Sequence, residues 1–276
     1  MSAVATTLGL ARSTVTARLA PAEPRRRGRP PQRDDDLLAR IKAVIADMPT
    51  YGYRRVHAIL RRAAEQGDGP PAPNHKRVWR VMKQHGLLLQ RHAGREDRRH
   101  DGRIAVAERN RRWCSDGFEV GCDNGERVRV AFALDCCDRE AMSFIATTGG
   151  IAGEHICDLM VAALEHRFGA VDELPHVIEW LSDNGSCYIA RDTRRFARGI
   201  GLEPRTTPLE SPQSNGMAEA FVRTFKRDYV RVNAIPDAQT FMSMLPAWFD
   251  HYNRVHPHKA LRYRSPAEFI RASLTT

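Results

Sequence analysis

The chain has 276 residues, of which 42% are hydrophobic and 28% charged, and a formal net charge of +10 at pH 7. This composition is typical of a folded protein and excludes an intrinsically disordered one, and the length favours two domains. Apolar runs are far shorter than the roughly 18 residues of a membrane-spanning helix, and the start lacks the pattern of a signal peptide. We therefore expect a cytoplasmic protein with no membrane partner.

The positive charge is concentrated in the first 112 residues. They contain 25 Lys and Arg against 11 Asp and Glu, a net charge of +14, whereas the rest of the chain contains 18 against 22, a net charge of −4. Solubility explains a high net charge but not this separation. The pattern therefore indicates a nucleic-acid-binding region joined to a region with another role.

Residues 1–36 are expected to form an N-terminal arm and a basic, Pro-rich linker. Residues 2–19 predict two short helical pieces, either a frayed helix or part of a helix-turn-helix. Prolines then exclude regular structure around Arg25, Arg27 and Arg29. The Arg-Gly-Arg-Pro segment resembles the core of an AT-hook, so these arginines are candidate minor-groove contacts; a solvated basic linker explains them equally well.

Residues 37–92 are expected to form a helical DNA-binding module. Apolar stripes at helical spacing predict three helices, the third of them capped by Asn74. Four basic residues lie on that helix: Lys76, Arg77, Arg80 and Lys83. A basic third helix after a turn is typical of an element that reads a DNA groove, whereas a solvated face would not explain the crowding of charge opposite an apolar stripe. Residues 93–112 form a second basic linker, which can follow phosphates without ordering.

Residues 113–229 alternate between strand and helix patterns. Three strands come first, with Asp123-Asn124-Gly125 as a hairpin signal between the first two. A helix, a strand, a helix, a strand and a helix follow, which is the order of the RNase H-like α/β fold with a mixed five-stranded sheet and flanking helices. Residues 230–276 predict a C-terminal helical extension of this core.

Two carboxylates stand at informative places in that pattern. Asp183 ends a short apolar strand just before a turn. Glu219 lies in the first turn of a helix, 35 residues after Asp183, and Lys226 follows two turns later on the same helical face. Carboxylates suit Mg²⁺, and two such ions serve phosphodiester transfer. Asp135 and Asp138 are the nearest rivals, and Asp135 is expected either close to the site or simply ending a strand.

These residues resemble the Asp-Asp-Glu transposases and retroviral integrases. Trp113-Cys114-Ser115-Asp116 is similar to the family's Trp-x-x-Asp entry, and the spacing from Asp183 to Glu219 and Lys226 is similar to the rest of its motif. Four further stretches resemble the OrfB transposase of frameshifting bacterial insertion sequences more closely. They are Tyr51 to Arg55, Leu134 to Glu140, Ser211 to Gly216, and the segment from His251 to Pro266.

The resemblance covers about residues 37–276 and implies a function. It implies a helix-turn-helix-like domain before an RNase H-like core, with Asp116, Asp183 and Glu219 as catalytic ligands of Mg²⁺, or of Mn²⁺ as a substitute. It also implies that Lys226 contacts DNA.

The enzyme would cut element ends and join the freed 3′ hydroxyl to target DNA. It would act as a homo-oligomer on DNA at the nucleoid, alone or with the upstream-frame product or a fusion to it. A DNA-binding regulator with an idle core and a metal-dependent nuclease are the alternatives.

Overall fold

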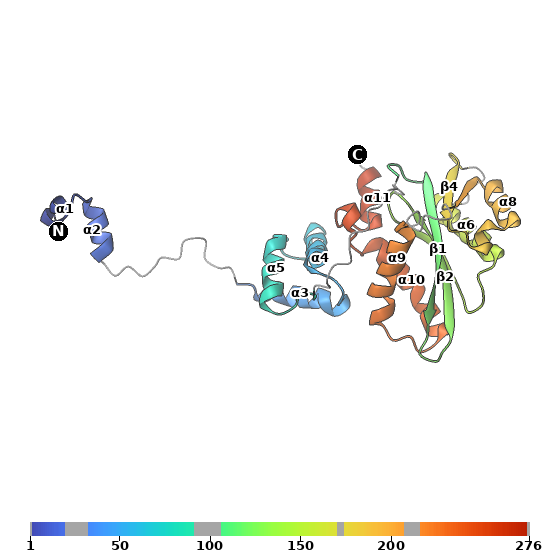
Figure 1. Cartoon of the computed structure of the whole chain (residues 1–276), viewed down its shortest axis with the longest axis horizontal. Coiled ribbons are helices and arrows are strands. Elements are labelled where there is room, and N and C mark those ends of the chain that lie inside the picture. The colour runs from blue at the N-terminus through green and yellow to red at the C-terminus, as the bar shows by residue number, and fades with distance from the viewer. Residues whose placement is uncertain (1, 20–32, 91–105, 170–173, 207–215, 275–276) are drawn as a thin grey trace. The chain divides into compact units, whose positions relative to one another are not determined.

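The computed structural model describes residues 2–19, 33–90, 106–169, 174–206 and 216–274. Contacts divide the chain into two compact units, Met1–Asp36 and Leu37–Thr276. In the first unit, α1 (Ser2–Thr7) and α2 (Arg12–Leu19) confirm the two short helical pieces that the sequence predicts. Figure 1 gives the element order along the chain.

The second unit begins with the three predicted helices, which we call the helical module. They are α3 (Asp35–Asp47), α4 (Tyr53–Glu65) and α5 (His75–Gln84). The start of α5 is fixed by Asn74, whose side chain accepts a hydrogen bond from the backbone N–H of Lys76 at 2.8 Å. Val78, Val81 and Met82 turn the apolar stripe of α5 inward and are fully buried.

A five-stranded mixed sheet forms the centre of the remaining chain, in the order β3-β2-β1-β4-β5. Its strands are β1 (Arg112–Gly121), β2 (Arg127–Asp135), β3 (Ala141–Thr147), β4 (Ile178–Ser182) and β5 (Leu202–Thr206). The first three strands pair antiparallel, as short turns allow, whereas β4 and β5 join in parallel after helical crossovers. This arrangement confirms the RNase H-like fold class.

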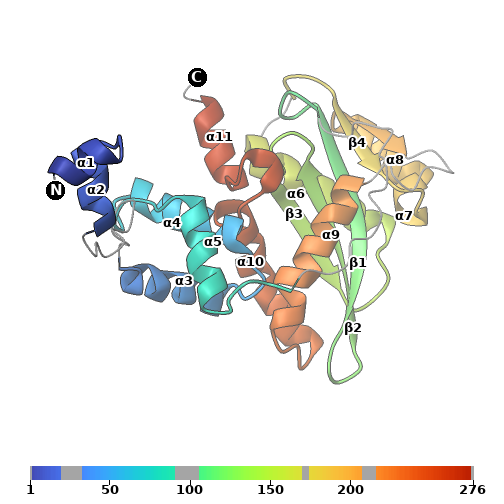
Figure 2. The same ribbon diagram turned by 60° about the vertical axis from the view of Figure 1, so that its left-hand side comes forward.

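Helices cover both faces of the sheet (Figures 1 and 2). The crossover helices are α6 (Gly153–Phe168), α7 (Ser186–Ile189) and α8 (Arg191–Gly199). They enclose one hydrophobic cluster, centred on Trp113, Trp180 and Leu159. The other face is covered by α9 (Gly216–Asp228) and α10 (Ala238–Arg254).

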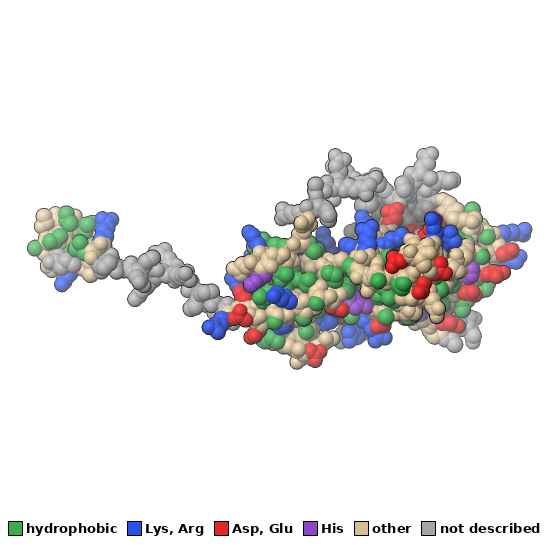
Figure 3. Space-filling view, turned by 90° about the horizontal axis from the view of Figure 1, so that it is seen from below, with side chains coloured by type: hydrophobic (Ala, Val, Ile, Leu, Met, Phe, Trp, Pro, Cys, Tyr) green, Lys and Arg blue, Asp and Glu red, His purple; other side chains and the backbone are tan. Residues whose placement is uncertain are grey.

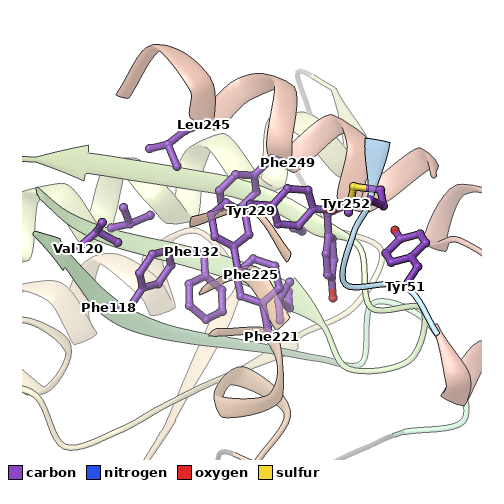
Figure 4. Packing of buried hydrophobic residues seen from close by; sticks show 14 of the residues in the cluster. Tyr51, Phe118, Val120, Phe132, Phe221, Phe225, Tyr229, Leu245, Phe249 and Tyr252 are labelled. Atoms are coloured by element: carbon purple, nitrogen blue, oxygen red, sulfur yellow. The ribbon is translucent and has the colours of Figure 1, made fainter. Parts of the chain in front are cut away.

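The second hydrophobic cluster joins the helical module to the sheet. It contains Phe118 and Phe132 of the sheet, Phe221 of α9 and Phe249 of α10, and it continues to Tyr51 just before α4 (Figure 4). The rings of Phe132 and Phe221 lie 4.3 Å apart between centroids. One continuous core means that the helical module packs against the sheet and its helices rather than standing apart from them.

Polar contacts fix the same junction. The Tyr51 hydroxyl lies 3.0 Å from Nδ1 of His256, and Arg55 of α4 donates to the buried Asp228 at the end of α9 at 3.2 Å. Arg62 forms a bidentate pair with Glu268, its Nη2 lying 2.6 Å from Oε2. Removing only one partner of such a buried ion pair destabilises the fold by several kcal/mol.

The chain ends in a short irregular segment and α11 (Pro266–Leu274). Two 3₁₀ turns, Val230–Val232 and Lys259–Leu261, precede α10 and α11 respectively. Within the described residues, no helix has the length and apolar character that a membrane span requires.

Candidate active site

Asp116 lies in the middle of β1 on the face covered by α9. It is half-buried between Cys114 and Phe118, the residues two positions away that point to the same face. Its partner across the antiparallel ladder is Phe132 of β2. The backbone N–H of Gly117 donates to Asp116 Oδ1 at 2.7 Å, which holds one carboxylate oxygen next to the strand.

Asp183 directly follows β4, at the level of Asp116. Parallel pairing matches Cys114 to Leu181, and two further residues on each strand lead to Asp116 and Asp183. The strands that carry the two aspartates are therefore adjacent, although they are far apart in the sequence. Asp183 is exposed, and its Oδ1 accepts a hydrogen bond from the backbone N–H of Gly185 at 3.0 Å.

The turn after Asp183 is tightly packed at Gly185. A Cβ on Gly185 would lie 3.0 Å from Asp183 Oδ1 and 3.4 Å from Tyr188. Tyr188 in turn bonds Ser115 of β1 through their hydroxyl groups at 2.9 Å in the buried core. The short helix α7 and the turn are therefore anchored to the strand that carries Asp116.

Glu219 lies in the first turn of α9, as predicted. The apolar stripe of Met217, Phe221 and Phe225 is buried against the sheet, which leaves Glu219 exposed at the margin of the packed face. Lys226, two turns later, is half-buried, with its Nζ 5.7 Å from the centre of the Phe118 ring. Phe118 is two residues beyond Asp116 and points to the same face of β1. Helix α9 therefore crosses this face of β1 with Lys226 beside Phe118.

The three carboxylates influence one another electrostatically. Burial raises the pKa of Asp116 from 3.8 to about 6, against the opposing effect of the Gly117 N–H. The negative charges of Asp183 and Glu219 raise it further. The fold thus places two further carboxylates beside one half-buried carboxyl, an arrangement that favours binding of a cation.

Basic side chains stand beside these acids in one groove of about 600 Å³, which we call the Asp116 groove. It is lined by Asp116, Gly117, Glu219, Val222, Arg223, Lys226, Arg227 and Arg231. Two acids next to four cations suit a phosphodiester, whose charge the cations attract while the acids hold a metal ion. Figure 3 shows one face of the molecule, on which Lys and Arg side chains gather beside acidic ones.

Sequence reasoning missed three arginines of this groove, Arg223, Arg227 and Arg231. Glu219, Arg223 and Arg227 are spaced by four residues, which places them along one side of a helix, so the signal was present in the sequence. Arg227 is held by Asp228, with its Nε 2.5 Å from Oδ1 and its Nη2 2.6 Å from Oδ2.

Asp135, the rival carboxylate, has a structural role. It ends β2 in a fully buried position, opposite Trp113. Its Oδ2 accepts from the backbone N–H of Asn110 at 2.7 Å and from Trp113 Nε1 at 3.2 Å, and its Oδ1 accepts from Cys137 N at 2.7 Å. Both oxygens of the Asp135 carboxylate therefore accept hydrogen bonds that hold the end of β2 in place.

The basic residues predicted on α5 form a surface separate from the Asp116 groove. Lys76, Arg80 and Lys83 are exposed, and Arg77 is half-buried. Trp79 is 40% exposed on the same helix, and Lys83 Nζ lies 5.1 Å from the centre of its ring. An exposed Trp among basic side chains can stack or pack on a sugar-phosphate backbone. Arg25, Arg27 and Arg29 lie outside the described residues.

Family models match both halves of the chain. An HTH-like domain matches residues 32–95, and two integrase core domain models match residues 106–212 and 200–266. These matches, with the sheet order above, define a protein with an integrase core and a helix-turn-helix-like region before it.

Among curated proteins, transposase InsD for insertion element IS2A/D/F/H/I/K of Escherichia coli is 57% identical over 241 residues, which are 86% of this chain and 79% of the relative. The chain therefore belongs to this family of insertion-element transposases, and it is a DNA transposase with an integrase catalytic core. The predicted resemblance is thereby confirmed.

Solved structures give more distant similarities. One is the simian T-cell lymphotropic virus intasome in complex with PP2A regulatory subunit B56 gamma, at 15% identity and a TM-score of 0.48, covering 77% of this chain and 73% of that one. Another is the Mos1 transposase catalytic domain with raltegravir and Mg, at 14% identity and a TM-score of 0.43, covering 51% and 71%.

Proposed function

We propose that Asp116, Asp183 and Glu219 are the catalytic carboxylates of this transposase. They would cut DNA at the ends of the element and transfer the freed 3′ hydroxyl to another phosphodiester. The observation that carries the proposal is the parallel pairing of β1 with β4, whose register leads to Asp116 and Asp183 at one level while α9 crosses β1 with Glu219. The raised pKa of Asp116 supports the proximity of all three.

The donor set fits Mg²⁺, with Mn²⁺ as a substitute. All three donors are carboxylates, which hard divalent cations prefer, and the charge that raises the pKa of Asp116 requires a counter-ion. In the described parts of the chain, no three acidic, His or Cys side chains converge closely enough to hold one ion together. Binding would therefore draw the carboxylates of Asp116 and Asp183 away from the N–H groups of Gly117 and Gly185.

Each residue then has a defined task. Asp116, Asp183 and Glu219 would hold one or two divalent ions, which supply activation of the attacking oxygen and neutralisation of the leaving oxygen. Lys226 would bind the phosphate next to the scissile one and hold the strand in line. Arg223 and Arg227 would attract the flanking backbone, and the half-buried position of Asp116 limits competing water.

The remaining chain would deliver the DNA. The helical DNA-binding module, residues 37–92, would bind the element end through Lys76, Arg77, Arg80 and Lys83. The basic linkers, residues 1–36 and 93–112, would follow the phosphates. The integrase core, residues 113–229, would carry out the chemistry together with its C-terminal extension, residues 230–276. Joining two element ends requires at least two copies, so a homo-oligomer on DNA is expected, alone or with the upstream-frame product. We expect the enzyme to act in the cytoplasm, at the nucleoid, because its DNA substrate would lie there.

The test uses supercoiled plasmid that carries the DNA flanking this gene. Purified chain is added with Mg²⁺ or with Ca²⁺, and nicks and joined ends are mapped. Asp183→Asn is compared with Asp192→Asn, a control on α8 whose side chain is 83% exposed beside Arg195. We expect Mg²⁺-dependent nicks at the element boundaries and joined products, both abolished by Asp183→Asn and retained by Asp192→Asn, while DNA binding survives in both variants.

Three results would change the assignment. Cleavage that persists in Asp183→Asn would refute the site. Nicks without joined products would make the chain a metal-dependent nuclease. Binding without cleavage in the unaltered chain would make it a regulator on its own, and the assay would then be repeated on a fusion to the upstream frame.

A further inference from the structure

A second groove, of about 530 Å³, lies between α4 and the C-terminal segment and shares no lining residue with the Asp116 groove. We call it the arginine groove. Its lining is Arg61, Arg62, Glu65, Gln66, Arg262, Arg264, Glu268, Arg271 and Ala272. Five arginines therefore face two carboxylates in this groove.

One of the two carboxylates is already neutralised within the fold. Glu268 is paired with Arg62 through both oxygens, and its Oε2 also accepts from the backbone N–H of Ser265 at 2.7 Å. The side chains of Arg62 and Glu268 are only 12% and 17% exposed. This pair forms the floor of the groove, and its charges cancel.

The rest of the lining is strongly positive. Glu65 lies 3.4 Å from Arg61, with 63% of its side chain exposed, so water screens this contact. Among the described lining residues, it is the one carboxylate left to balance Arg61, Arg262 and Arg264. The groove therefore presents an excess of guanidinium groups, each able to bind a phosphate through two N–H donors.

The turn that carries Arg262 and Arg264 is strained and rigid. Arg262 and Tyr263 are consecutive non-glycine residues in the left-handed region, with φ of 56° and 62°. Backbone hydrogen bonds close the turn on His258, which accepts from Tyr263 at 2.8 Å and donates to Arg264 at 3.0 Å. Buried Leu261 and Ser265 anchor its two sides. The fold thus keeps an unfavourable conformation that displays two exposed arginines.

The form of the groove selects among anionic ligands. Its described lining contains no aromatic ring that could stack on a base, and its cations are spread over α4, the turn before α11, and α11. A mononucleotide would find neither a base pocket nor enclosure, whereas a polymer with regularly spaced phosphates would meet several guanidinium groups. We propose that the arginine groove binds the phosphate backbone of duplex DNA, as a contact separate from the Asp116 groove and from α5.

The proposal takes DNA as the partner from the proposed function, but it needs no catalytic chemistry. A backbone contact is independent of sequence, so it should strengthen binding to element-end DNA and to unrelated duplex alike. The contact on α5, by contrast, is expected to favour the element end.

The test compares two charge-matched double variants. Arg262→Gln with Arg264→Gln removes two groove cations, and Arg195→Gln with Arg198→Gln removes two from α8, where the side chains are 75% and 56% exposed. Fluorescence anisotropy gives the Kd for element-end and unrelated duplexes at several salt concentrations.

We expect the groove variant to reduce the slope of log K against log salt by about 2 and to weaken binding roughly tenfold or more on both duplexes, and the α8 variant to change neither. Arg262→Lys with Arg264→Lys, which keeps the charge, should retain the slope. An unchanged slope in the groove variant, or an equal loss in the α8 variant, would overturn the proposal.

A second measurement uses the unaltered chain and does not depend on folding of a variant. Phenylglyoxal modifies accessible arginines, and mass spectrometry reads the extent at each site. Duplex DNA should protect Arg262 and Arg264 and leave Arg195 reactive; equal reactivity with and without DNA would overturn the proposal. If instead the proposed catalytic site is wrong, cleavage would be absent while DNA still protects Arg262 and Arg264, so the two failures can be told apart.

Discussion

Replacement of Asp116 by Asn should stabilise the metal-free protein while it abolishes catalysis. Burial, together with the charges of Asp183 and Glu219, raises the pKa of Asp116 from 3.8 to about 6 in the folded state. The folded protein therefore favours the protonated carboxyl. The stabilisation that the protonated carboxyl of Asp116 gives the folded state is fully present below pH 3.8 and is lost as the pH rises through about 6.

The size of the effect follows from the shift. A change of about 2 pKa units corresponds to roughly 3 kcal/mol between the two limits of pH, and partial exposure of Asp116 reduces this to about 2–3 kcal/mol. At pH 4.5 most of the cost has disappeared, leaving about 1 kcal/mol. Asp116→Asn keeps the size of the side chain and an oxygen for the Gly117 N–H but carries no charge, so it escapes the cost at every pH.

The assay is thermal unfolding in EDTA, followed by circular dichroism. For a protein of this size, each kcal/mol moves Tm by about 2–4 °C, so Asp116→Asn should raise Tm by about 4–10 °C at pH 7.5 and by only about 2–4 °C at pH 4.5. Asp192→Asn, the exposed control, should match the unaltered chain at both pH values. Added Mg²⁺ should raise the Tm of the unaltered chain more than that of Asp116→Asn, because the cation binds the folded carboxylates.

A single result would refute this reasoning. If Asp116→Asn is no more stable than the unaltered chain at pH 7.5 in EDTA, then burial and the neighbouring acids do not raise the pKa of Asp116. The three carboxylates would then not form one electrostatic unit, and the site would have to be sought elsewhere. A gain in stability that does not depend on pH would equally exclude the carboxyl charge as its cause.

Three further predictions follow from other contacts. Asp228→Ala should cost about 3–5 kcal/mol in urea unfolding, because it leaves Arg55 and Arg227 facing a buried, unpaired site; Asp250→Ala, at a 59% exposed position, should cost less than about 0.5. Lys226→Ala should slow nicking roughly ten- to hundredfold with little change in Tm, measured at saturating DNA. Loss of one exposed basic side chain on α5 should reduce the salt slope of DNA binding by about 1, measured by anisotropy.

The local part of the fold could be predicted from the sequence. Asp123-Asn124-Gly125 indicated the β1–β2 hairpin, and the stripe of Met217, Phe221 and Phe225 indicated α9, because hairpins and amphipathic helices depend on neighbouring residues. The order of strands and helices then fixed the fold class, and the spacing of the acids indicated which of many carboxylates to consider.

The pairwise geometry could not be predicted in the same way. Pairing of β1 with β4 joins residues 67 positions apart, such as Cys114 and Leu181, and no local signal sets that register. Nor could the sequence decide the role of Asp135, since an acid at a strand end looks the same whether it binds backbone N–H groups or a metal ion. The pairing of Arg62 with Glu268 and the arginine groove depend on how α4 packs against the C-terminal segment, which only the tertiary structure gives.

One helix links the DNA-binding and catalytic parts of this molecule. α9 carries Glu219 at its beginning and buried Asp228 at its end, nine residues and about 14 Å apart along a rigid axis. Asp228 is bonded to Arg55 of α4, so the docking of the helical module and the position of Glu219 share one mechanical connection. A displacement of α4 must either break that buried pair, at a cost of several kcal/mol, or shift α9 against the sheet. Because shifting α9 would disturb the ring contacts of Phe221 and Phe225, the less costly course is for the helical module and α9 to move together. DNA bound at the proposed contact on α5 would then be held in a fixed relation to Glu219.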